Sequence, residues 1–448
     1  MRCQSAVLNA PLLVSMVFLP GSWAAADSHE PTYLVILGQP ETFSAEFLPC
    51  SADSPRQVGW GVVLYTLGTP LADLRRNVEA ALDTSEKTGY PLLLHLDDWN
   101  FPPPSTDPDW VEWTAFPKPG EEHRPLVRRR WLNWGTWVAT GPPPNYESPK
   151  FRAFMRSQIA EGVVKPVASR LRRWRKEGQA HLFAGVVVGW ESGYYSMPAP
   201  ADRPAADKDT FDDSEVVTTG YAALTRRGYT AERLAKEARV RGITEQALFR
   251  ELMADVVHDY SAYLCRICAR GGLPRDRIYT HYTPAITAAD PATVAGDGRL
   301  LPVRTAVNRY SRPGYTMTRG WADSDTVVAE VREAGREEWG AVEIETVAAT
   351  RTEEAALAQF DWLACHGARV LCIYGWWETE GHMFAVRGTG AVGAIGRWLA
   401  ESSGPPSALR PASPTSPACA ALSIRRSTGA KPVPHGPTNR TCRGQHRR

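Results

Sequence analysis

The sequence has 448 residues, enough for one large domain or two of average size, and 43% of them are hydrophobic, as in a globular protein with a sizeable core. The formal net charge is +2, but residues 404–448 contain eight Lys or Arg and no Asp or Glu, which leaves 43 basic and 49 acidic side chains in residues 1–403. This mildly acidic body lacks the basic surface that nucleic-acid binding requires, so we expect no nucleic-acid partner.

The two ends of the chain differ in composition from the rest. Arg2 precedes a largely apolar stretch over residues 6–19, and Ala24-Ala25-Ala26 offers small residues for cleavage, which together predict a signal peptide over residues 1–26. The apolar stretch is shorter than a membrane span, so we expect a secreted or periplasmic protein, with an uncleaved anchor as the alternative. Residues 404–448 are rich in Pro, Ser, Ala and Arg and predict a disordered basic tail.

Between these ends, over residues 27–403, short apolar runs alternate with segments of helical periodicity. The runs predict β-strands over residues 33–37, 61–65, 92–96, 185–189, 277–282, 305–310, 340–345 and 370–376. The helical patterns cover residues 71–87, a long stretch that begins after Ser148-Pro149, and residues 244–270, 323–335 and 352–366. Long loops follow the third and fourth predicted strands.

Eight strands that alternate with helices predict parallel pairing, and eight is the number that closes a barrel. We therefore expect an α/β fold of the (β/α)8 TIM-barrel type, formed as a single domain over residues 27–403 with long βα loops. The first strand is short and the gap to the second contains no clear helix, so a doubly wound open sheet is the alternative.

In a barrel of this type, the residues that bind and react with a ligand stand at the carboxyl ends of the strands. The strand ends here carry carboxylates, aromatic rings, one His and one Arg: Asp97, Asp98, Trp99, Trp190, Glu191, His281, Tyr282, Tyr310, Arg312, Glu343, Glu345, Trp376 and Trp377. No glycine-rich phosphate loop and no GxSxG turn accompanies them, and metal-ligand spacing is weak. Paired carboxylates and rings suit the cleavage of sugars, in which one carboxyl protonates and the other attacks or activates water.

The position of the carboxylates along the chain suggests a family. Glu191 ends the fourth predicted strand, Glu343 lies on the seventh, and Trp376 ends the eighth. This layout resembles the clan of (β/α)8 retaining glycoside hydrolases that includes β-galactosidases, xylanases, cellulases and β-mannanases. The order of strands and helices is similar over residues 30–402, whereas the amino-acid sequence itself is similar only in short motifs.

The resemblance implies that Glu191 is the general acid/base and Glu343 the nucleophile. In the clan an asparagine usually precedes the acid/base glutamate, whereas Trp190 stands there in this sequence. The segment Val342-Glu343-Ile344-Glu345 is similar to the Thr-Glu-Leu-Asp pattern of xylanases. Glu345 is the alternative nucleophile, or a partner that orients a hydroxyl.

Each of these residues also has a purely structural interpretation. Glu191 could cap its strand in solvent, Glu343 could be a buried salt-bridge partner, and Trp376 could pack in the core instead of stacking on a sugar. A carboxyl separation of about 5–5.5 Å would indicate retention of configuration, and one of about 6.5–9.5 Å inversion.

The sequence therefore predicts an exported glycoside hydrolase that acts on a poly- or oligosaccharide by a two-carboxylate, retaining mechanism. It would need no cofactor and no metal, because protonation of the leaving oxygen and covalent capture of the sugar suffice. The expected sugar-binding residues are Asp97, Asp98, Trp99, Trp190, His281, Tyr282, Tyr310, Arg312, Trp376 and Trp377. The alternatives are a metal-dependent polysaccharide deacetylase that uses Asp97, Asp98 and His281, and a barrel that binds glycans without cleaving them.

Overall fold

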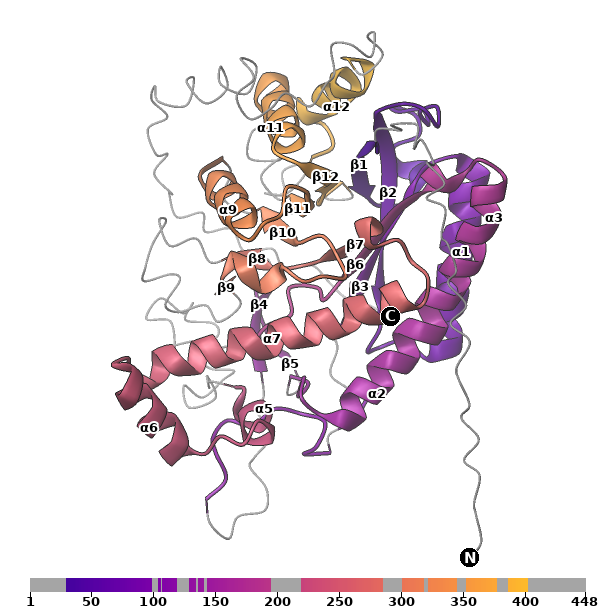
Figure 1. Cartoon of the computed structure of the whole chain (residues 1–448). Helices are drawn as coiled ribbons and strands as arrows, with labels where there is room; N and C mark the ends of the chain where they lie inside the picture. The colour runs from indigo at the N-terminus through magenta and orange to yellow at the C-terminus, as the bar shows by residue number, and fades with distance from the viewer. Residues whose placement is uncertain are drawn as a thin grey trace, which may run out of the picture. The chain divides into compact units, whose positions relative to one another are not determined.

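The computed structural model describes residues 30–98, 104–105, 107–118, 129–133, 136–140, 143–194, 219–284, 300–317, 321–344, 352–376 and 386–401. The chain divides into two compact units, Met1–Glu30 and Pro31–Arg448, and the fold below is that of the second unit (Figure 1). The predicted signal peptide and basic tail lie outside the described residues and stay predictions.

The second unit is built on one sheet of eight parallel strands in the order β10-β11-β12-β1-β2-β3-β6-β7. These strands are β1 (Thr32–Leu37), β2 (Arg56–Tyr65), β3 (Leu92–Asp97), β6 (Phe183–Val188), β7 (Ile278–Thr280), β10 (Gly314–Met317), β11 (Trp339–Ile344) and β12 (Ala368–Ile373). Isolated parallel bridges, Tyr279 to Arg312 and Tyr282 to Tyr315, join the two outermost strands of this order. The sheet is therefore a nearly closed (β/α)8 barrel, and the predicted fold is confirmed.

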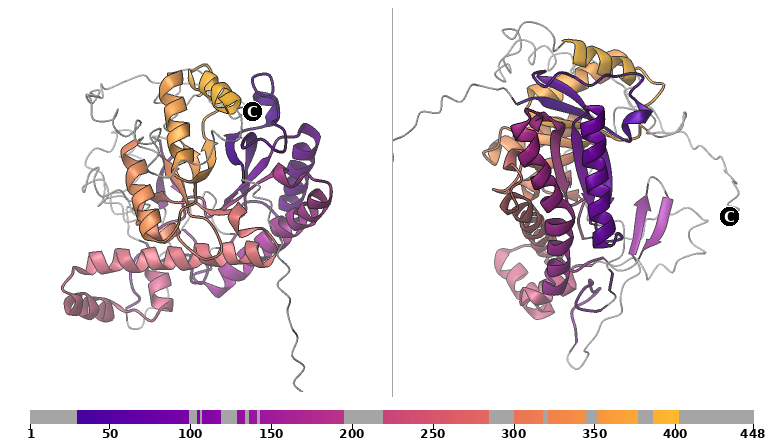
Figure 2. Two further views of the ribbon diagram at one scale, coloured as in Figure 1. Left: turned by 45° about the horizontal axis from the view of Figure 1, so that its top comes forward. Right: turned by 90° about the vertical axis from the view of Figure 1, so that its right-hand side faces the viewer.

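Helices surround the strands (Figures 1 and 2). They are α1 (Leu71–Thr88), α2 (Pro149–Ser157), the π-helical segment η2 (Gln158–Val164), α3 (Lys165–Lys176), α5 (Tyr221–Arg226), α6 (Ala231–Arg241), α7 (Glu245–Arg270), α9 (Trp321–Glu333), α11 (Glu353–Cys365) and α12 (Ala391–Ala400). The short strands β4 (Arg129–Asn133) and β5 (Thr136–Thr140) form an antiparallel pair, and β8 (Thr283–Pro284) pairs with β9 (Leu300–Leu301). The short helices are η1 (Pro40–Thr42), η3 (Ala180–Leu182), η5 (Arg275–Arg277) and η6 (Val303–Ala306).

Two hydrophobic layers hold the barrel together. The inner layer fills the barrel with inward side chains such as Tyr33, Val187, Tyr279 and Val342. The larger outer layer lies between the strands and the helices. Because side chains alternate along a strand, Tyr279 on β7 lies inside whereas its neighbour Ile278 lies in the outer layer. The same alternation directs His281, two residues beyond Tyr279, toward the interior.

The sixth barrel strand differs from the prediction. Residues 305–310 were expected to form it, but Val303–Ala306 is a short 3-10 helix and the strand is Gly314–Met317. Pro302 precedes the helix and Pro313 precedes the strand, and each proline removes a backbone donor, which suits a turn and a strand start rather than a strand interior. Tyr310 and Arg312 therefore precede the sixth strand instead of ending it.

Within the described residues, no helix combines the length and the apolar character needed to cross a membrane.

Candidate active site

A tight turn after the fourth barrel strand carries Glu191. Strand β6 ends at Val188, Gly189 follows with φ of 76°, and Ser192 N–H donates to the Gly189 carbonyl at 3.4 Å. Glu191 itself has φ of 46° and is the single non-glycine residue with positive φ among the described residues. This conformation is costly for a residue with a side chain and concentrates at functional sites, so the turn marks Glu191 as a functional candidate.

A β-bulge in the seventh barrel strand directs Glu343 into the barrel. Thr316 on β10 pairs with Glu343 although Tyr315 pairs with Ala341, so Val342 is one extra residue in β11. The pairing of β11 with β12 shifts in the same place. Regular alternation would place only one of these two neighbours inside, but Val342 belongs to the inner layer and Glu343 contacts the inward His281. The bulge thus adds a carboxylate to the barrel interior.

Glu191, His281 and Glu343 converge at one place. Each offers one ligand atom, a carboxylate oxygen or a ring nitrogen, and these atoms all lie within 4.8 Å of one another. His281 Nε2 is 3.4 Å from Glu343 Oε2 and 2.8 Å from the Thr316 hydroxyl. The Thr283 and Thr316 hydroxyls both donate to Glu191 Oε1, at 2.6 and 2.7 Å.

The charge states of this cluster follow from its burial. Burial raises the pKa of Glu343 well above its ordinary value, and the nearby charges of Glu191 and Asp97 raise it further. Burial also lowers the pKa of His281 to about 4, although the surrounding carboxylates oppose this shift. His281 is therefore neutral at pH 7, and its short contact to the Thr316 hydroxyl fits a proton on Nε2.

Aromatic rings pack against the His281 imidazole. The Trp190 ring lies 5.3 Å from the His95 ring and 5.2 Å from the His281 ring, and Trp190 is 7% exposed. His95 is fully buried on β3, and its Nε2 lies 3.5 Å from the Cys372 sulfur. Trp190, expected to bind sugar, thus packs on the histidines and supports the position of His281.

Asp97 and Asp98 end the third strand, and each is 1% exposed. The Ser192 hydroxyl donates to Asp98 Oδ1 at 2.9 Å, which ties the turn that carries Glu191 to the end of β3. Burial raises the pKa of Asp98 to about 6, against the effects of the Tyr260 and Ser192 hydroxyls. Asp98 thus supports the turn that carries Glu191.

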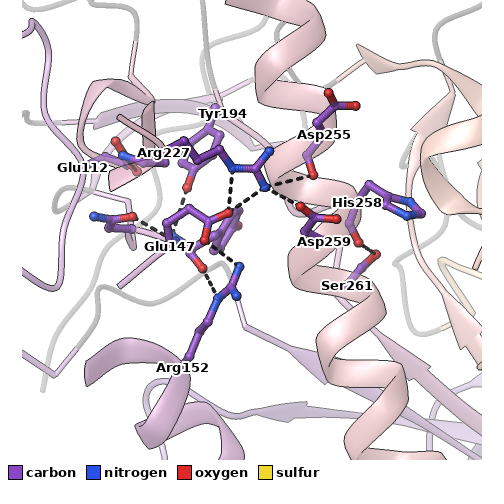
Figure 3. A network of polar contacts seen from close by, with 12 residues as sticks. Glu112, Glu147, Arg152, Tyr194, Arg227, Asp255, His258, Asp259 and Ser261 are labelled. Atoms are coloured by element: carbon purple, nitrogen blue, oxygen red, sulfur yellow. Dashed lines mark hydrogen bonds and ion pairs between the residues drawn. The ribbon is translucent and has the colours of Figure 1, made fainter. Parts of the chain in front are cut away.

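A further buried carboxylate, Glu112, lies in a separate network (Figure 3). It accepts backbone N–H groups from Ala222 and Ala223 at 3.0 and 3.2 Å, in the first turn of α5. Burial raises its pKa to about 8, partly offset by the Tyr194 hydroxyl, which also accepts the Tyr146 N–H at 2.9 Å. The segment after Glu191 is thereby fastened to two other parts of the chain.

The same network includes an ion-pair cluster. Arg227 contacts Glu147 at 2.6 Å and Asp259 on α7 at 2.5 Å, and Arg152 contacts Glu147 at 3.0 Å. Figure 3 shows the three segments that these side chains connect.

Several predicted site residues lie elsewhere. Tyr282 points to the outer layer, where its hydroxyl donates to the Val257 carbonyl at 3.2 Å. Trp376 is 1% exposed, donates to the Thr42 carbonyl at 3.2 Å and packs against Phe43 and Phe47, which agrees with its packing interpretation.

Tyr310 and Arg312 are at the opposite end of the barrel, contrary to prediction. Arg312 binds the Asp276 carbonyl and the Glu338 carboxylate, which precede strands β7 and β11. The cause is the displaced sixth strand described above. Trp99, Glu345 and Trp377 lie outside the described residues.

Sequence reasoning missed the threonines, Ser192 and His95. The period of two that continues from Tyr279 on β7 through His281 points to Thr283, and the same period places His95 two residues before Asp97. The sequence did not indicate that Thr316 faces the barrel interior, because the sixth strand was predicted over residues 305–310.

Glu191, His281 and Glu343 have donor types that suit a divalent metal ion. A metal bound at His281 Nε2 would move the ring proton to Nδ1, and this atom is buried without a hydrogen-bond partner in the described structure. Histidines that bind metals normally donate their second N–H to a partner. The cluster therefore fits a pair of carboxylates beside a neutral imidazole better than it fits a metal centre.

Comparisons with known proteins identify the fold and not a family. No family model matches the chain, and no curated protein matches it. Among solved structures, the chain is similar to the catalytic domain of β-amylase from Paenibacillus polymyxa, with 9% identity, a TM-score of 0.50 and coverage of 84% of this chain and 99% of that chain. At this identity the similarity supports the barrel architecture alone and assigns no residue a role.

Proposed function

We propose that the protein is a glycoside hydrolase that cleaves a poly- or oligosaccharide with retention of configuration, of the clan that the strand layout suggests. The observation that carries the proposal is the approach of Glu191 and Glu343 to within 4.8 Å from the fourth and seventh barrel strands. An upper bound of 4.8 Å between one oxygen of each carboxylate is compatible with the roughly 5–5.5 Å separation of retaining enzymes and lies below the roughly 6.5–9.5 Å that leaves room for the water of an inverting enzyme. The likeness to a β-amylase catalytic domain supports the proposal at the level of the fold.

In this proposal Glu191 is the general acid/base and Glu343 the nucleophile. Glu191 is partly exposed, which allows it to pass its proton to a leaving group and to recover one from water. Glu343 is 2% exposed, and two carboxylates this close compete for one proton. The raised pKa of Glu343 places that proton on Glu343 in the ligand-free site, so the proposed first step requires the form in which the proton is on Glu191 and Glu343 is ionised.

The experiment is reducing-sugar release from a panel of polysaccharides and oligosaccharides by the wild type and by Glu191→Gln and Glu343→Gln. Each variant should lose at least about 10²-fold in kcat, the lower end of what positioned acid–base groups contribute. Glu161→Gln is the matched control, because Glu161 is an exposed partner of Lys165 and should retain activity. Full activity in both site variants would show that this pair is not the catalytic pair.

A metal-dependent polysaccharide deacetylase that uses Asp97, Asp98 and His281 is the less supported alternative, because the ligand atoms that converge belong to Glu191, His281 and Glu343, and His281 Nδ1 lacks the partner that a metal-bound histidine needs. It predicts acetate release from an acetylated polysaccharide that stops with EDTA and returns with Zn²⁺. Binding of the same glycans without release of either product would instead favour the non-catalytic glycan-binding barrel.

We also propose that the protein is exported, on the basis of Arg2, the apolar stretch and the alanines at 24–26. Expression of the full chain in a secreting host should yield a mature N-terminus near Asp27. An intact N-terminus at Met1 on the exported protein would contradict cleavage.

A further inference from the structure

One oxygen of Glu191 accepts two hydroxyl groups from different strands. Thr283, the first residue of β8, donates to Oε1 at 2.6 Å, and Thr316, on β10, donates to the same atom at 2.7 Å. The side chains come from neighbouring strands across the barrel closure, where Tyr282 bridges to Tyr315. The two donors therefore hold the Glu191 carboxylate from the part of the barrel that follows β6.

The direction of these hydrogen bonds follows from the donors available. His281 Nε2 lies 2.8 Å from the Thr316 hydroxyl oxygen, and neutral His281 can donate its Nε2 proton there. Thr316 accepts that proton and has one of its own, which it can give only to Glu191 Oε1 in this geometry. Thr283 gives its single proton to the same oxygen. Both lone pairs of Oε1 are then occupied, so Oε1 has no room for a proton of its own.

We propose that Thr283 and Thr316 are positioning residues that reserve Glu191 Oε1 as a hydrogen-bond acceptor and leave Oε2 to carry the catalytic proton. This inference rests on the proposed function. It assigns a role to two residues outside the catalytic pair and explains why hydroxyl-bearing side chains occupy positions where valine would have nearly the same shape.

With the proton on Glu191 Oε2, the two steps of the retaining reaction account for every bond and proton. In the first step the proton on Glu191 Oε2 passes to the glycosidic oxygen as the C–O bond breaks, and a Glu343 oxygen forms the glycosyl ester. In the second step Glu191 Oε2 takes a proton from water, the water oxygen bonds to the sugar carbon, and the ester bond to Glu343 breaks. Glu191 is ionised between the steps, and the two hydroxyls then stabilise and orient it.

The test compares Thr283→Val, Thr316→Val and the double variant with the serine variants at the same positions. The substrates are two glycosides of a sugar that the wild type cleaves, one with an alkoxide leaving group and one with dinitrophenolate. Departure of the alkoxide requires a proton from Glu191, whereas dinitrophenolate departs without one. The valine variants should therefore lose about 10–100-fold in kcat/KM on the alkyl glycoside, the scale of a misplaced catalytic group, and less than about threefold on the dinitrophenyl glycoside.

The serine variants should recover most of the loss, because they restore the hydroxyl. Thr280→Val is the control: Thr280 ends β7, and its hydroxyl donates to the Ala306 carbonyl at 3.2 Å and accepts the Gly314 N–H at 3.0 Å. Its loss should lower activity on the two glycosides by the same factor, if at all.

An equal loss on both glycosides in the valine variants, or no loss on either, would overturn the positioning role. Failure of the proposed function is distinguishable from this result, because it appears as full activity in Glu191→Gln and Glu343→Gln.

Discussion

At the scale of single residues, the site depends on a backbone conformation that Glu191 would not adopt by itself. Its φ of 46° requires support, and the Ser192–Asp98 hydrogen bond gives it directly beside the turn. The Thr283 and Thr316 hydroxyls hold the other end of the same side chain. Glu191 is thus fixed from both its backbone and its carboxylate.

Ser192→Ala should lower kcat by about tenfold or more, because the turn can relax and move the Glu191 carboxylate away from its position. The free energy of unfolding should fall by only about 1 kcal/mol, typical of one buried hydrogen bond. Ser261→Ala is a suitable control, because the buried Ser261 hydroxyl donates to the His258 carbonyl on α7. Equal kcat in the two variants would contradict a role for Ser192 in positioning Glu191.

At the scale of elements, the site is located where the barrel departs from regular geometry. The bulge in β11 turns Glu343 inward, and the approach of β7 to β10 brings both threonines to Glu191. Gly314 makes that approach possible, because a Cβ at this position would lie 2.1 Å from the Thr280 carbonyl oxygen. The close approach of β7 and β10 at Gly314 therefore both closes the barrel and places Thr316 beside Glu191.

Gly314→Ala should force β10 away from β7, lower the free energy of unfolding by about 1–3 kcal/mol and reduce kcat, because Thr316 would move from Glu191. Gly396→Ala is the matched control: Gly396 lies within α12, and a Cβ there meets no atom within 4 Å. That variant should be stabilised by about 0.5–1 kcal/mol with unchanged activity. Thermal unfolding and kcat of the two proteins would check both effects, and a Gly314→Ala enzyme with wild-type values would contradict the packing argument.

At the scale of the whole molecule, buried acids make stability depend on pH. Burial raises the pKa of Asp98 from 3.8 to about 6 and that of Glu112 from 4.5 to about 8, so the folded state binds protons that the unfolded state releases. Their contribution to stability is complete below about pH 4 and is lost as the pH rises to about 8.

Glu112→Gln should reduce this dependence between about pH 5 and 8, because an amide at position 112 does not titrate. Thermal unfolding midpoints across that range test the prediction, with Glu161→Gln as a surface control. An unchanged slope in Glu112→Gln would show that Glu112 does not titrate in this range.

The parts of the fold that were predictable are those with strong local patterns. Apolar runs such as Leu92–Leu96 and the periodic helix that ends at Arg270 specified most of the barrel, and Glu191 and Glu343 followed from their strand positions. The sixth strand was missed because Gly314–Met317 is four residues long and holds only one aliphatic side chain. That error misplaced Tyr310 and Arg312 and hid Thr316. The β11 bulge has no sequence signal, since it depends on pairing with two neighbouring strands.

The most direct test of the proposed catalytic pair is the stereochemistry of rescue by azide. Glu191→Ala and Glu343→Ala would each be assayed with a dinitrophenyl glycoside and sodium azide, and the glycosyl azide analysed by proton NMR. We predict an azide product with the configuration of the substrate from Glu191→Ala, because azide attacks the glycosyl ester on Glu343. Glu343→Ala should give the opposite configuration, because azide replaces the missing nucleophile directly. The reverse pattern, or rescue of neither variant, would contradict the assigned roles.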